Sequence, residues 1–104
     1  MKHKKLLTHQ EILRMLEMHK NVLERYNVKK IGLFGSYAAG RQSRQSDIDF
    51  VVEFSEPSFD NFMGLVSYLE KLFGKKIDVL THEGVEGIRI NSVAKSIKRS
   101  VIYV

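Results

Sequence analysis

Apolar residues recur at helical spacing in two long stretches of the chain. The first stretch begins at Thr8 and Glu11, which form a capping box, and ends near Asn27, a residue that tolerates a left-handed stop. The second begins after Ser58, a suitable N-cap, and ends at Gly74. Two amphipathic helices are therefore predicted, with apolar faces made of Ile12, Leu16, His19, Leu23 and Tyr26 in the first and Phe59, Phe62, Val66, Leu69 and Phe73 in the second.

Three shorter segments, residues 29–34, 47–54 and 75–81, have the composition and alternation of β-strands. Residues 84–99 show a weaker helical pattern, and residues 101–104 are either a last strand or a docking segment. The order α-β-β-α-β-α predicts one α/β domain over residues 1–104, with two layers, a small mixed sheet and helices packed on one face.

Composition narrows the class of protein only slightly. The chain has 104 residues and a net charge of +5. It has no cysteine, which excludes disulfides and thiolate-bound zinc. The charge is spread out, so ordinary surface charge and nucleic-acid binding both stay open. We see no apolar segment of membrane-spanning length and expect a cytoplasmic protein. Self-association is not decided by the sequence.

Two aspartates begin the second predicted strand. Asp47 and Asp49 lie two positions apart, so they point to the same face, opposite Ile48 and Phe50. Two neighbouring carboxylates repel each other, and a divalent cation such as Mg²⁺ compensates that repulsion. If the third strand lies beside the second, Asp78 joins them, and three carboxylates can hold two metal ions about 3.5–4 Å apart.

A Gly-Ser turn follows the first predicted strand. Gly35 allows the backbone to approach a phosphate closely, and the Ser36 hydroxyl can donate to a phosphate oxygen. The spacer to Asp47 must return the chain to the end of the first strand, and it carries Arg41 and Arg44, which could reach a triphosphate. Each piece alone has an ordinary structural explanation, but together they favour a magnesium and phosphate site.

Two further side chains lie near these residues in the sequence, and each has a functional and a structural explanation. Tyr37, directly after Ser36, either contacts nucleotide or partner or packs in the core. His82 follows the third strand, and we interpret it as an exposed loop residue rather than part of the site.

The pattern Gly35-Ser36, ten residues, Asp47-Ile48-Asp49 and a later Asp78 resembles the nucleotidyltransferase superfamily of DNA polymerase β. More closely, the chain resembles the minimal nucleotidyltransferases, which are often encoded beside a HEPN-domain protein. The resemblance covers nearly the whole chain, including the terminal run Val101-Ile-Tyr-Val. It implies the two-layer nucleotidyltransferase fold and Mg²⁺-dependent transfer of a nucleoside monophosphate, usually AMP from ATP, to a hydroxyl.

Roles for individual residues follow from the same resemblance. Asp47 and Asp49 would bind both metal ions, Asp78 would bind the catalytic ion and help to activate the hydroxyl, and Gly35 and Ser36 would hold the β- and γ-phosphates. In paired systems the target is a tyrosine on a HEPN toxin, which would make this chain the antitoxin.

The chain departs from the family pattern in the spacer, and two other functions stay open. Many relatives have arginine before the spacer glycine, where this chain has Ala39-Gly40, so Arg41 and Arg44 become the candidates for phosphate contact. A second hypothesis is an antitoxin that masks its partner without catalysis. A third, a nucleic-acid binder, rests only on charge and predicts affinity that falls steeply with salt.

Overall fold

A four-stranded mixed sheet forms the centre of the protein. The computed structural model describes residues 7–86 and 101–104. The strand order is β3-β2-β1-β4, with β1 antiparallel to both β2 and β4 and β3 parallel to β2. This confirms the predicted mixed sheet, whose strands are β1 (Val28–Phe34), β2 (Ile48–Phe54), β3 (Ile77–Thr81) and β4 (Ile102–Tyr103).

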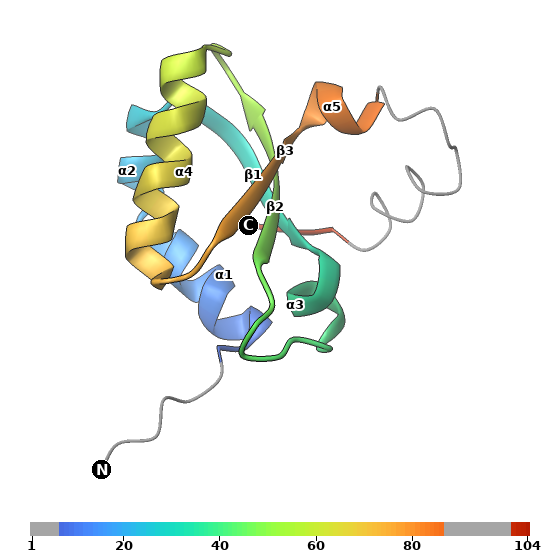
Figure 1. Cartoon of the computed structure of the whole chain (residues 1–104). Coiled ribbons are helices and arrows are strands. Elements are labelled where there is room, and N and C mark those ends of the chain that lie inside the picture. Colours follow the sequence, from blue (N-terminus) through green and yellow to red (C-terminus); the bar gives the residue numbers. More distant parts are fainter. Residues whose placement is uncertain (1–6, 87–100) are drawn as a thin grey trace.

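The larger helices cover one side of this sheet. Figure 1 shows α1, α2 and α4 together beside the strands, while α3 follows the end of β1 and α5 follows the end of β3. Within the described ranges, no helix is both long and apolar enough to span a membrane. The helices are α1 (His9–Met18), α2 (Lys20–Arg25), α3 (Gly35–Ala39), α4 (Phe59–Phe73) and α5 (His82–Glu86).

The core lies between the sheet and these helices. Alternate residues of β2 face it, as the strand pattern predicts, and the Phe50 ring lies 6.0 Å from the Phe73 ring of α4. Burial of this apolar face is the main force that holds the two layers together. The core residues of β2 are Ile48, Phe50, Val52 and Phe54.

The first predicted helix is interrupted, and its prediction as one unbroken helix is wrong. His19 leaves the helical conformation (φ −114°, ψ 23°) and separates α1 from α2. Its ring makes an edge contact with Tyr68 at 6.3 Å, so tertiary packing accompanies the break. No glycine or proline marks the position, which is why local sequence gives no signal. The predicted stop at Asn27 is confirmed by its φ of 61°.

Strand boundaries differ slightly from the prediction near the carboxylates. Asp47 lies just before β2, and Lys75 and Lys76 lie just before β3. The Ile48 N–H donates to the Lys76 carbonyl at 3.1 Å, so pairing of these strands begins at that bond. Of the predicted helix 84–99, residues 87–99 lie outside the described part of the chain, while the terminal segment forms the short strand β4.

The first turn of α4 departs from the predicted apolar face. Phe59 is 76% exposed, so its assignment to the core is wrong. Phe62, one turn later, packs against Phe54, the last residue of β2, with ring centroids 6.4 Å apart. The helix therefore starts beyond the end of the sheet, and Phe59 has no strand beneath it.

Candidate active site

Gly35 lies directly against the carboxylate of Asp49. Its φ is +75°, a left-handed conformation that side chains disfavour. A Cβ atom at this position would collide with Asp49 Oδ2 and lie 3.1 Å from its Cγ. The neighbouring Phe34 pairs with Asp49 across the β1–β2 ladder. Glycine is therefore required here for two reasons, its backbone angle and the space that Asp49 occupies.

Asp78 lies on the other side of Asp49. The parallel register pairs Asp49 of β2 with Asp78 of β3, so both side chains point to the same face. Asp78 is exposed and Asp49 is half-buried. The expectation that the third strand lies beside the second is confirmed, and the structure brings Gly35, Asp49 and Asp78 together from three different strand ends.

This arrangement disturbs the ionisation of Asp49. Burial, repulsion by Asp78, a hydrogen bond shared with Asp78 and repulsion by Asp47 together raise the pKa of Asp49 from its usual 3.8 to about 6. A carboxyl group in this condition is stabilised by a proton or by a cation. The oxygen donors of Asp49 and Asp78 thus fit a hard divalent cation such as Mg²⁺.

Asp47 is close enough to affect Asp49 but also faces a lysine. The Nζ atom of Lys76 lies 4.0 Å from Asp47 Oδ2; the Lys76 side chain is 72% exposed and that of Asp47 is 36% exposed. Among the described residues, no three acidic or histidine side chains are already gathered around a single metal position. Sequence reasoning missed Lys76, although it stands two residues before Asp78 and alternation places both on one face.

The spacer between Ser36 and Asp47 is held by hydrogen bonds. The Gln42 side chain donates to the Leu7 carbonyl at 2.9 Å, and the Ser43 N–H donates to Ser46 Oγ at 2.8 Å. The Lys75 ammonium donates to the Arg44 carbonyl at 2.9 Å. These bonds fix the path of the loop from α3 back to the start of β2.

The two arginines of this spacer are exposed. The Arg41 backbone N–H donates to the Ser36 carbonyl at 2.8 Å. Neither arginine side chain forms an ion pair with the three aspartates, all of which lie in the described part of the chain. Arg41 and Arg44 lie on the spacer loop, and their contact with phosphate stays a prediction.

Tyr37 is a core residue. It is 1% exposed and belongs to the main hydrophobic cluster, so the packing alternative for this residue is confirmed. Its hydroxyl group is buried and has no hydrogen-bond partner. Packing of Tyr37 fixes α3, and α3 in turn begins at Gly35.

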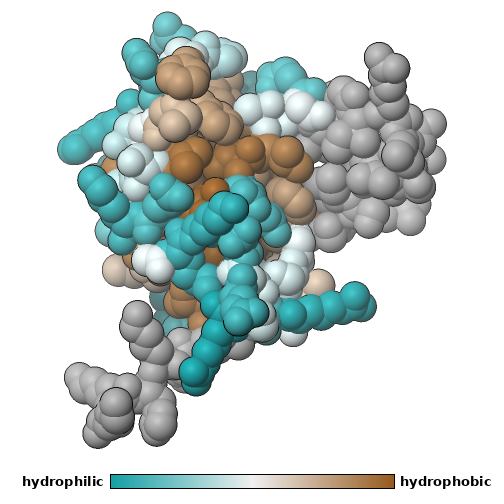
Figure 2. Space-filling model, viewed as in Figure 1, coloured by the Kyte–Doolittle hydropathy of each residue, from teal (hydrophilic) through white to brown (hydrophobic). Residues whose placement is uncertain are grey.

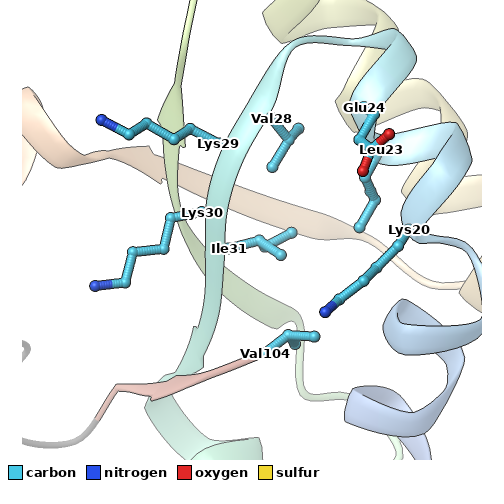
Figure 3. A pocket seen from close by; sticks show the side chains of 8 residues that line it. All are labelled: Lys20, Leu23, Glu24, Val28, Lys29, Lys30, Ile31 and Val104. Carbon is cyan, nitrogen blue, oxygen red and sulfur yellow. The ribbon is translucent and has the colours of Figure 1, made fainter.

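A pocket of about 190 Å³ lies at the opposite end of β1, between that strand and α2. Figure 3 shows Val28 and Ile31 on the α2 side of the β1 ribbon, with Lys29 and Lys30 extending on the other side. None of the three aspartates lines this pocket. His82 is exposed, as predicted, but it begins α5 instead of lying in a loop, and it follows the end of β3 that lies away from Asp78. The candidate site is therefore the group of Gly35, Asp49 and Asp78 at the other end of β1.

The fold and this arrangement define a class of protein. A family model described as a nucleotidyltransferase domain matches residues 16–104. The chain belongs to the nucleotidyltransferase family.

Two relatives are similar over almost their full length. "Putative protein adenylyltransferase MJ1379" of Methanocaldococcus jannaschii is 46% identical over 98 residues, which cover 90% of this chain and 95% of the relative. "Protein adenylyltransferase MntA" of Thermococcus cleftensis is 40% identical over 101 residues, which cover 95% of this chain and 98% of the relative.

Solved structures share the fold at lower identity. A "putative minimal nucleotidyltransferase" matches with a TM-score of 0.73 and 23% identity, over 92% of this chain and 95% of that one. A chain of a toxin-antitoxin crystal structure with AMP-PNP matches with a TM-score of 0.61 and 20% identity, over 93% and 72%. A chain of the complex of tri-AMPylated Shewanella oneidensis HEPN toxin with MNT antitoxin matches with a TM-score of 0.51 and 15% identity, over 84% and 69%.

Proposed function

We propose that this protein is a Mg²⁺-dependent adenylyltransferase that transfers AMP from ATP to a hydroxyl group on a partner protein. The observation that carries the proposal is the position of Asp49, enclosed between the backbone of Gly35 and the carboxyl group of Asp78. A half-buried carboxylate beside a second carboxylate and a close glycine turn is costly to the fold, and binding of a nucleotide with its cation compensates that cost.

Each side chain has a role in this proposal. Gly35 and Ser36 hold the β- and γ-phosphates at the end of β1, with Arg41 and Arg44 reaching from the spacer. Asp47, Asp49 and Asp78 hold up to two Mg²⁺ ions, as the oxygen-rich donor set allows. When bound, these ions neutralise phosphate charge and polarise the α-phosphate.

The reaction is a single displacement at phosphorus. The acceptor hydroxyl oxygen forms a bond to the α-phosphorus, and the bond from that phosphorus to the bridging oxygen of the β-phosphate breaks. Pyrophosphate leaves, and the hydroxyl proton passes to the Asp78 carboxylate, which is the exposed member of the pair. Orientation of the hydroxyl beside Asp78 supplies much of the rate enhancement.

Support for the substrate and the partner comes from the relatives. Two sequence relatives bear the name protein adenylyltransferase, a solved neighbour contains AMP-PNP, and another accompanies an AMPylated HEPN toxin. We extend these features to this chain as proposals: ATP is the nucleotide, a HEPN-domain toxin is the partner, and the protein acts as its antitoxin. The cytoplasmic location stays a prediction.

The test combines the protein with the product of its neighbouring gene, labelled ATP and Mg²⁺. We expect label to appear on the partner and to disappear, by about a thousandfold or more, in Asp47→Asn and Asp49→Asn, because the charge that holds the cation is lost. Removal of Mg²⁺ with a chelator should have the same effect as the substitutions.

The same preparations separate catalysis from masking. If both variants still neutralise the toxicity of the partner as well as the unchanged protein does, the antitoxin works by binding and the catalytic proposal is wrong. Glu53→Gln is the matched control, because Glu53 lies on the same face of β2 as Asp49 but at its other end.

A further inference from the structure

The strand that carries Asp78 lies at the edge of the sheet. In the part of the chain that the structure describes, β3 pairs with β2 on one side and with no strand on the other. An edge strand presents backbone N–H and C=O groups that can pair with an extended peptide. An exposed carboxylate and an edge with which no described strand pairs therefore occur on the same five-residue strand.

The two sides of Asp49 differ in what they leave accessible. On the β1 side, the backbone of Gly35 already contacts Asp49, and this is the side of the proposed phosphate turn. On the β3 side, Asp78 is exposed. The nucleotide and the acceptor must approach the same carboxylates from different directions, so the β3 edge is the side left for the acceptor.

This edge carries positive charge next to Asp78. Lys76 lies two residues before Asp78, so alternation places both on one face, and the 72% exposed side chain of Lys76 reaches toward Asp47. An exposed ion pair at 4.0 Å is weak, which leaves the ammonium group available to another anion. In the orientation of Figure 1, Figure 2 shows apolar surface in the middle of the molecule, with hydrophilic side chains beside and below it.

We propose that the acceptor is an extended protein segment that pairs with the free edge of β3 and carries Asp or Glu two positions from its accepting hydroxyl. In such a pairing the hydroxyl residue lies across from Asp78. Its neighbour two positions away on the same face then lies across from Lys76, where an acidic side chain is attracted. This inference rests on the proposed function and names the substrate class of the same site.

A peptide fits this edge better than a nucleic acid. Backbone hydrogen bonding to an edge strand is available to a peptide, and Leu80, which is half-buried and lies on the same face as Asp78, offers apolar contact beyond it. A nucleic acid would instead use cations along its whole path, whereas the residue that follows Asp78 on its own face of β3 is the apolar Leu80. An RNA hydroxyl is therefore an alternative outcome of the test.

The experiment measures AMP transfer to synthetic peptides that contain one hydroxyl residue. Three versions differ only at the positions two residues before and after it, which hold Asp, Ala or Lys. We expect kcat/KM to fall by about tenfold from Asp to Ala, mainly through KM, because the lysine contributes to binding rather than to chemistry. Equilibrium binding of the same peptides without nucleotide should follow the same order.

A charge exchange makes the test specific to Lys76. Lys76→Glu should reverse the preference, so that the Lys-containing peptide becomes the better substrate. Lys20→Glu is the matched control: Lys20 also forms an exposed ion pair, with Glu17 at 3.3 Å, but lines the pocket at the far end of β1. This control should leave the peptide preference unchanged.

The outcomes separate the two proposals. The edge-strand inference is wrong if the protein modifies its partner but treats the three peptides alike, modifies none of them or modifies an RNA hydroxyl in their place. The proposed AMP transfer is then still tested separately, by the assay with the partner protein. If no acceptor of any kind receives AMP from ATP, the proposed function is wrong and the inference falls with it.

Discussion

Two sets of side chains on opposite faces of β2, the apolar residues on one and Asp49 on the other, have opposite effects on the stability of the protein. On one face, Ile48, Phe50 and Val52 are fully buried against the helices. On the other, Asp49 is half-buried beside Asp78, and its pKa is raised to about 6 because its charge is poorly tolerated. The same strand therefore contributes to folding through Ile48, Phe50 and Val52 and opposes it at Asp49.

This difference indicates which residues are present for stability and which for chemistry. An apolar residue at position 49 would relieve the repulsion from Asp78 without loss of a core contact, since Asp49 does not belong to the core cluster. A carboxylate in a costly environment is a frequent property of active sites. The comparison predicts that substitutions on the two faces separate stability from activity.

The largest effect on stability is expected at Phe50. Phe50→Ala should lower the free energy of unfolding by about 3–5 kcal/mol, because the side chain is completely buried and leaves a cavity beside Phe73. Denaturant unfolding followed by circular dichroism measures this change. Phe50→Leu, which keeps most of the volume, should cost clearly less, and an equal cost for both would contradict the packing account.

Among substitutions that leave the charge of the protein unchanged, the largest effect on activity is expected at Gly35. Gly35→Ala should reduce AMP transfer by about a hundredfold, because the added Cβ collides with Asp49 and displaces it from its working position. Steady-state kinetics with labelled ATP measure the loss.

Gly74→Ala is the matched control for this change. Gly74 also has a positive φ, of +64°, but an added Cβ would meet nothing within 4 Å. Both variants should lose about 1–2 kcal/mol of stability from the left-handed conformation. Only Gly35→Ala should lose transfer, and equal activity in the two variants would mean that the Gly35–Asp49 contact has no role in the reaction.

Most of the fold can be predicted from the sequence, because the residues that determine each helix or strand lie within that element or next to it. The capping box at Thr8, the left-handed stops at Asn27 and Gly74 and the alternation in β2 each determine structure within a few residues. The break at His19 and the exposure of Phe59 were not predictable in this way. Both depend on what packs opposite them, namely Tyr68 in the first case and the end of β2 in the second.

A smaller effect is expected from the ionisation of Asp49. Its folded pKa of about 6 lies above its usual 3.8, so the folded state binds the proton more tightly than the unfolded state. The stabilisation is fully present below about pH 4 and is lost as pH rises through about 6. A shift of this size would be about 3 kcal/mol for a buried group, and solvent screening of half-buried Asp49 lowers our expectation to about 1 kcal/mol.

Asp49→Asn tests this directly in the metal-free protein. The variant should be as stable as the unchanged protein near pH 4 and more stable by about 1 kcal/mol at pH 7, since the repulsion is removed. Unfolding measured at several pH values in the presence of a chelator gives the difference. Glu53→Gln should show no such gain, because Glu53 pairs with Lys29 at 3.2 Å, and unfolding of Asp49→Asn would mean that the carboxylate is structural.

The carboxylates of the candidate site could be predicted from the sequence, but the prediction of its cationic side chains was incomplete because it missed Lys76. Spacing places Asp47 and Asp49 on one face, yet the adjacency of Asp78 depends on strand order, which the sequence supports only as an assumption. The family pattern, which has an arginine in the spacer, makes Arg41 and Arg44 the candidates for phosphate contact. The position of Lys76 relative to Asp47 emerges only from the structure, where its Nζ atom lies 4.0 Å from Asp47 Oδ2.

The most direct test of the account compares two positions of label in ATP. With the partner protein and Mg²⁺, label in the α-phosphate should be transferred to the partner, and label in the γ-phosphate should be released as pyrophosphate. Asp49→Asn, although at least as stable, should transfer neither. The proposal is that the Asp49 carboxylate is needed for adenylyl transfer although it lowers the stability of the metal-free protein. Transfer of the γ-label to the partner, or undiminished transfer of the α-label by Asp49→Asn, would contradict it.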